Sequence, residues 1–147
     1  MPVTDLIIFG TVLVGIYMLV WYLVSIRAKD ASLVDIAWGL GFIMLALGLA
    51  IAHQCESSTH YLVTTLVVIW GLRLTIHIAR RKIGAPEDWR YQKWRNQWGK
   101  WFNLRSLVQI FGLQAVLMLV VSASIFVASA SDEEATIGLW QILGLVI

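Results

Sequence analysis

Three ionisable side chains interrupt apolar stretches of the sequence, at Asp35, Arg73 and His77. Ionisable residues inside a membrane helix are rare because they are costly to bury, so by default each indicates a functional site. Arg73, His77 and either Arg80 or Arg81 recur at spacings of three and four, which places them on one stripe of a helix. Because guanidinium groups match the geometry of phosphate oxygens, a pocket ringed by these residues would suit a phosphate-bearing ligand.

Asp35 and Arg73 also have structural explanations. Ser32 and Asp35 have the spacing of a capping box at a helix start, and Arg73 can extend its side chain to the membrane surface. Asp35 follows Lys29 by six residues and Arg73 precedes Arg80 by seven, so both lie roughly 9–10 Å inside the cytoplasmic boundary at the usual helical rise. We therefore predict that Asp35 and Arg73 pair across two helices, since a partner offsets part of the cost of burial.

The long polar stretch 79–106 holds the remaining candidates. Pro86 and the acids Glu87 and Asp88 suit the first turn of a helix, and Gly99 suits its end, so we expect a helix over 87–98. Its aromatic residues share one face by spacing, and its basic residues lie among them. These residues are Tyr91, Trp94 and Trp98, and Arg90, Lys93 and Arg95. Two interpretations remain open: an amphipathic helix on the membrane surface, or a basic lid over an anionic ligand.

The elements that position these residues are membrane helices. The chain has 147 residues, of which 59% are hydrophobic and only 14% charged, whereas a soluble domain carries roughly 25% charged residues. Backbone polar groups in hydrocarbon must be satisfied within their own segment, so long apolar stretches predict helices. Four stretches are long enough to cross a bilayer: 6–26, 34–52, 61–78 and 107–130. We predict an all-α, polytopic transmembrane bundle that forms a single domain over residues 1–147.

A fifth apolar run occupies 135–147. At about 1.5 Å per residue it would reach only about 20 Å, against a hydrocarbon core of about 30 Å. We expect it to be the first part of a truncated membrane helix; the alternative is a short terminal segment at the membrane interface. The three His are scattered and Cys55 is the single cysteine, so we expect no metal site.

The basic residues predict the orientation of the bundle. All eleven lie in or beside two loops, and the opposite side, with Asp5 and Glu56, has no Lys or Arg. They are Arg27, Lys29, Arg73, Arg80, Arg81, Lys82, Arg90, Lys93, Arg95, Lys100 and Arg105. Basic loops stay in the cytoplasm, so we expect the N-terminus outside. This placement favours contacts with the lipid bilayer over nucleic acid, which we do not expect as a partner.

The candidate residues fall in three motifs that resemble a known family. The motifs are Asp35-Ile-Ala-Trp38-Gly39; Trp70-Gly71-Leu72-Arg73-Leu74 with His77 and Arg80; and Glu87-Asp88-Trp89-Arg90-Tyr91 with Arg95. In order and spacing they resemble the family of domain of unknown function 1295, which belongs with the steroid 5-alpha-reductases. The likeness runs over about 33–114, with apolar sequence on either side.

The resemblance implies a membrane-embedded reductase that binds NADPH from the cytoplasmic side. The reaction would reduce a carbon–carbon double bond conjugated to a carbonyl in a steroid or other lipid-like substrate, with hydride from the cofactor. The implied location is the bacterial inner membrane. From depth and chemistry we assign Asp35 and Tyr91 as catalytic candidates. The cofactor-binding candidates are Arg73, His77, Arg80, Asp88, Arg90 and Arg95.

The chain departs from the family pattern in one respect. The family carries an Arg-His-Pro-Asn-Tyr-like motif in its C-terminal half, and the only prolines here are Pro2 and Pro86. We therefore expect the chain to be an N-terminal part of the family fold, without the main NADPH motif. Two other functions stay open: a membrane methyltransferase of the isoprenylcysteine type, whose architecture is related, and a small transporter or non-catalytic membrane subunit.

Overall fold

The computed structural model describes residues 2–53 and 58–130, and its regular structure there is helical throughout. The predicted segment 135–147 and Cys55 lie outside these residues. The elements in order are α1 (Val3–Ala28), α2 (Leu33–His53), α3 (Ser58–Lys82), α4 (Trp89–Trp98), η1 (Gly99–Trp101), α5 (Phe102–Ser106), η2 (Leu107–Gly112), α6 (Leu113–Val121) and α7 (Ala123–Ala130).

The prediction of an all-α protein with four long apolar helices is confirmed. The described segments that are long and apolar enough to cross a membrane are Val3–Ala28, Leu33–Ala52, Thr59–Lys82 and Trp89–Val121. The fourth begins well before the predicted 107 because helical backbone continues from α4 through η1 and α5 into the apolar part.

The predicted uninterrupted helix over 107–130 is wrong in detail. Its first part, η2, is a π-helix, and Ser122 interrupts the helix between α6 and α7. The carbonyl of Ser122 accepts hydrogen bonds from the amides of Ile125 and Phe126, which starts the new helix. Hydropathy reports a continuous apolar run and carries no information about such local changes in winding.

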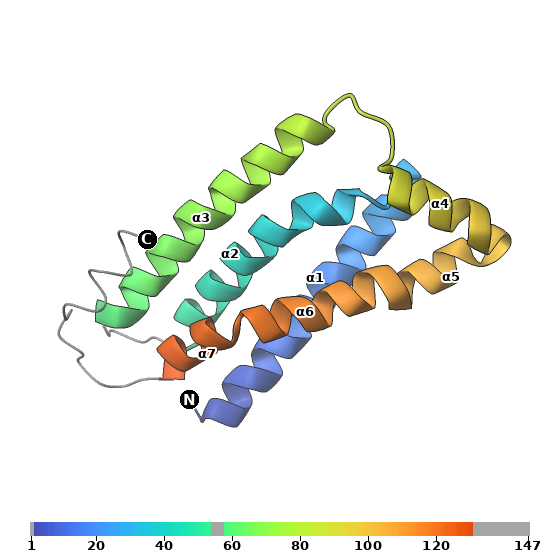
Figure 1. The fold of residues 1–147 in the computed structure, drawn as a ribbon. Coiled ribbons are helices and arrows are strands. Elements are labelled where there is room, and N and C mark those ends of the chain that lie inside the picture. Colours follow the sequence, from blue (N-terminus) through green and yellow to red (C-terminus); the bar gives the residue numbers. More distant parts are fainter. Residues whose placement is uncertain (1, 54–57, 131–147) are drawn as a thin grey trace.

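Figure 1 shows α2 lying between α1 and α3, with α6 and α7 crossing them and α4 packed at one end beside the α1–α2 loop. Two glycines let α2 and α3 approach closely. A Cβ atom built on Gly71 would lie 2.7 Å from the carbonyl oxygen of Gly39, and a Cβ on Gly39 would overlap the carbonyl of Gly71. Small residues at such crossings allow close backbone packing in membranes.

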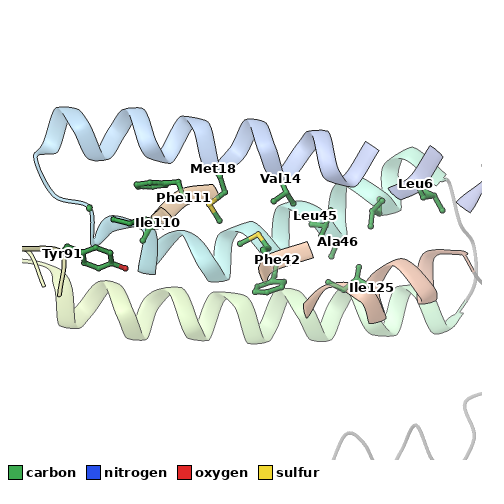
Figure 2. Close-up of a cluster of buried hydrophobic side chains, with 14 of the residues drawn as sticks. Leu6, Val14, Met18, Phe42, Leu45, Ala46, Tyr91, Ile110, Phe111 and Ile125 are labelled. Atoms are coloured by element: carbon green, nitrogen blue, oxygen red, sulfur yellow. The ribbon is translucent and has the colours of Figure 1, made fainter. Parts of the chain in front are cut away.

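The core runs along the length of the bundle. Its members share near-complete burial, from Leu6 at one end to Tyr91 at the other (Figure 2). Phe111 and Met118, from η2 and α6, fill the space between α1 and α2 together with Val14 and Leu45. Tyr91 therefore joins α4 to the same core that holds the membrane helices.

Candidate functional site

α4 ends with Gly99 as its C-cap, as the sequence predicts, but it begins at Trp89, two residues later than predicted, so Glu87 and Asp88 precede the first turn instead of forming it. Asp88 caps the helix, because its Oδ1 accepts the backbone N–H of Arg90 at 3.0 Å. Gly99 follows the last turn with φ of 50°, a conformation that glycine adopts without steric cost. The Arg90 guanidinium bonded to Asp88 holds the pKa of that carboxyl below its usual value.

Glu87 anchors the start of α4 to the α1–α2 loop. Its Oε1 accepts the amide of Ala31 at 2.8 Å, and both carboxylate oxygens accept from the Arg95 guanidinium at 2.8 and 3.0 Å. Arg95 also donates to the carbonyl of Lys29 at 3.3 Å. The Glu87 side chain is 9% exposed, so this bidentate pair is shielded from solvent and fixes α4 against the loop.

A second contact joins the same loop to the end of α3. Lys82 Nζ lies 2.7 Å from Asp30 Oδ2 and donates to the carbonyl of Pro86 at 2.7 Å. Burial raises the pKa of Asp30, but hydrogen bonds from Lys82 and Ser32 and the charge of Lys82 outweigh it and leave that pKa below its usual value. The two contacts together bring α2, α3 and α4 to one point.

Asp35 lies at that point. Its Oδ1 accepts the hydroxyl proton of Tyr91 at 2.9 Å, and its Oδ2 accepts from Arg90 Nη2 at 3.3 Å. Tyr91 is only 3% exposed, whereas the Arg90 side chain is half exposed. Tyr91 thus holds one carboxylate oxygen from the interior and Arg90 holds the other from the solvent side.

The predicted pair between Asp35 and Arg73 is wrong. Arg73 is exposed on α3 and makes no salt bridge with any described residue. The predicted capping box is also wrong, because the Asp35 carboxylate faces α4 while Ser32 bonds to Asp30. Similar predicted depths for Asp35 and Arg73 did not predict the pairing, because depth does not determine which face each helix turns to its neighbour.

A cavity of about 740 Å³ opens beside Asp35, between α2, α3 and the α3–α4 loop. That volume is typical of small-molecule sites. Its polar end comes from the α1–α2 loop, α2, α3, the α3–α4 loop and α4, and consists of Ser32, Asp35, Arg81, Lys82, Glu87, Asp88 and Arg90. Among the cations at this end, Lys82 and Arg90 are paired, while Arg81 makes no ion pair or hydrogen bond within the described residues. Among the described lining residues, Arg81 is therefore the cation that remains available to an anionic group.

The opposite end of the cavity is apolar and largely aromatic. It is lined by Trp38, Phe42, Trp70, Leu74, Ile78 and Val121. The Phe42 ring lies 5.6 Å from Trp38 and 5.4 Å from Trp70, so the aromatic rings form a continuous wall across α2 and α3. Trp38 Nε1 donates to Gln114 Oε1 of α6, which fixes the indole in that wall. The site is therefore amphiphilic, with its polar end at the loops.

The structure divides the predicted site residues into three groups. Asp35, Asp88 and Arg90 line the cavity, and Tyr91 lies behind Asp35. Arg95 is engaged by Glu87 outside the cavity. Arg73, His77 and Arg80 are exposed and do not line it, because the cavity side of α3 is another stripe.

Several lining residues were missed from the sequence. On α3 they are Trp70, Leu74, Ile78 and Arg81, whose spacings of four and three place them on one helical face. The sequence shows this spacing, but the neighbouring stripe with Arg73 and His77 contains more ionisable residues and was therefore predicted to be the functional face. Among the described residues no group of three or more His, Cys, Asp or Glu could hold a metal ion.

Fold and site define a class: a polytopic helical membrane protein with an amphiphilic cavity at the loop end of its bundle. The family model described as protein of unknown function (DUF1295) matches residues 21–147, so the chain belongs to the DUF1295 family. Searches among curated proteins and among solved structures find no match.

Proposed function

We propose that the protein is a membrane-embedded, NADPH-dependent reductase of the steroid 5-alpha-reductase type, acting on a lipid-like enone. The observation that carries this proposal is the hydrogen-bonded Asp35–Tyr91 couple at the polar end of an otherwise aromatic cavity. An enone lipid has the same two parts, a polar carbonyl and an apolar body. Its body would lie against the Trp38–Phe42–Trp70 wall and its carbonyl beside Asp35.

Asp35 and Tyr91 have different roles in this proposal. Asp35 lines the cavity, so its carboxyl is the group that touches the substrate oxygen. Tyr91 is buried behind it and positions it by holding Oδ1, which leaves Oδ2 to face the cavity beside Arg90. In this step Asp35 would act in its protonated form: it would give its proton to the substrate oxygen as hydride adds to the double bond, and the Tyr91 hydroxyl and the Arg90 guanidinium would stabilise the carboxylate that is left.

NADPH would supply the hydride. The lining residue that suits its anionic part is Arg81, which makes no ion pair or hydrogen bond with another described residue. Arg73, His77 and Arg80 lie on another face of α3 and do not line the cavity. Arg81 lies in the last turn of α3, beside the basic stretch of the sequence, which supports access from the cytoplasm; the family resemblance suggests the bacterial inner membrane.

The experiment is substrate-dependent NADPH oxidation in lipid nanodiscs by a protein that joins this chain to the C-terminal Arg-His-Pro-Asn-Tyr-like motif of the family, with progesterone and a long-chain lipid enone as probes. We expect oxidation that requires the enone and yields a saturated ketone. Asp35→Asn should lower the rate by about 10²–10⁴-fold, the usual contribution of a positioned acid or base. Asp5→Asn is the matched control, because Asp5 is exposed near the N-terminus, far from the cavity. Equal rates for the two variants would refute the proposed role of Asp35.

A further inference from the structure

An exposed stripe of α3 carries Arg73, His77 and Arg80, and the cavity does not use it. The three residues span about 10 Å of helix at the usual rise. None of them makes an ion pair or hydrogen bond with another described residue. Unpaired cationic side chains within a membrane span are costly, so this stripe calls for an anionic partner.

The surroundings of the stripe indicate what kind of partner it is. Ile69 and Ile76 alternate with the two arginines along the same stripe and are 61% and 48% exposed. Leu72, beside Arg73, is 46% exposed. Figure 1 places α3 at one edge of the described bundle, with α2 on its inner side. This face therefore presents apolar side chains to hydrocarbon and cations towards the membrane boundary.

We propose that the stripe Arg73–His77–Arg80 binds the phosphate headgroup of an anionic phospholipid in the cytoplasmic leaflet. Arg80 lies near the end of α3, at headgroup level, and Arg73 extends its side chain from deeper in the membrane towards the same phosphate. His77 lies between them and adds a hydrogen-bond donor. The acyl chains lie on Ile69, Leu72 and Ile76, a surface that a water-soluble dinucleotide would not use.

The test is native mass spectrometry of the detergent-purified chain with added phosphatidylglycerol or phosphatidylcholine. The wild type should retain phosphatidylglycerol preferentially. Arg73→Gln and Arg80→Gln should each weaken retention about fivefold, because one basic residue near an anionic surface contributes about 1 kcal/mol. Arg105→Gln is the matched control, since it removes the same charge from an exposed position on α5 and should leave retention unchanged.

Other results would overturn the proposal. Equal losses for Arg105→Gln and the stripe variants would mean that only overall charge attracts the lipid. Displacement of phosphatidylglycerol by NADPH would assign the stripe to the cofactor. An Ile76→Cys variant that forms a disulfide-linked dimer and retains no phosphatidylglycerol would assign it to a second copy of the chain. If Arg73→Gln unfolds the protein, Arg80→Gln, nearer the helix end, decides alone.

Discussion

The hydrogen bond between Tyr91 and Asp35 gives the sharpest prediction about the site. Tyr91→Phe removes the hydroxyl that donates to Asp35 Oδ1 at 2.9 Å and leaves the buried ring in place. A hydrogen bond to a charged group contributes about 1.5–3 kcal/mol to stability. The Asp35 side chain is 28% exposed and still accepts from Arg90 in the variant, so we expect the lower end of this range. We expect a loss of about 1.5 kcal/mol, or about 3–6 °C in the melting temperature of a chain of this size.

The assay is thermal unfolding in detergent, read by tryptophan fluorescence. Tyr61→Phe is the matched control, because Tyr61 is 58% exposed and should tolerate the loss of its hydroxyl. A double-mutant cycle with Asp35→Ala isolates the contact from other effects. We expect the Tyr91 and Asp35 changes to be coupled by about 1 kcal/mol or more; additivity within about 0.5 kcal/mol would show that the bond contributes nothing and would refute the reasoning.

Three further predictions concern the elements that form the site. Gly39→Ala should lower the stability of the protein by about 1–3 kcal/mol, because its Cβ would overlap the Gly71 carbonyl. Gly15→Ala is the control, since a Cβ there meets nothing and should not destabilise the protein; the melting temperatures of the two variants test this. Glu87→Ala should lower the stability of the protein by about 2 kcal/mol, because it leaves Arg95 and the Ala31 amide without their hydrogen-bond acceptor. The α3–α4 loop should then be cleaved faster by protease, and equal digestion of variant and wild type would contradict this. The pKa of Asp30 in the folded protein lies below its ordinary value of 3.8, so its contribution to stability is fully present above 3.8 and is lost as the pH falls from there through the lower folded-state pKa. Lys82→Gln should therefore move the acid-unfolding midpoint upward, and an unchanged midpoint would count against the Asp30–Lys82 pair.

The sequence predicts the membrane helices and the end of α4 because these depend on local chemistry, whereas the start of α4 lies two residues after the predicted one. Apolar runs must become helices in hydrocarbon, Asp88 caps the amide two residues on, and Gly99 adopts positive φ at little cost. The aromatic face of α4 was also predicted from spacing, and the structure stacks Trp94 on Trp98 with ring centroids 5.6 Å apart. That face packs against the protein core, with Tyr91 buried in it and Trp94 and Trp98 partly buried beside it.

The partner of Asp35 could not be predicted in the same way. Spacing tells which residues share a face of one helix, but the rotation of α2 relative to α3 is set by the Gly39–Gly71 contact, which only the folded chain shows. Arg90 and Tyr91 reach Asp35 because Glu87 folds α4 back onto the α1–α2 loop. That contact joins residues more than fifty positions apart, and no local pattern marks it.

The central claim is that the cavity between α2 and α3 holds the substrate, and filling it tests the claim most directly. Leu74 lines the cavity between Trp70 and Ile78, and Leu72, on the same helix, is exposed and does not line it. Leu74→Trp and Leu72→Trp are compared for enone-dependent NADPH oxidation, after matched melting temperatures show that both fold. The account predicts that Leu74→Trp loses the activity while Leu72→Trp keeps it; full activity in Leu74→Trp would contradict it.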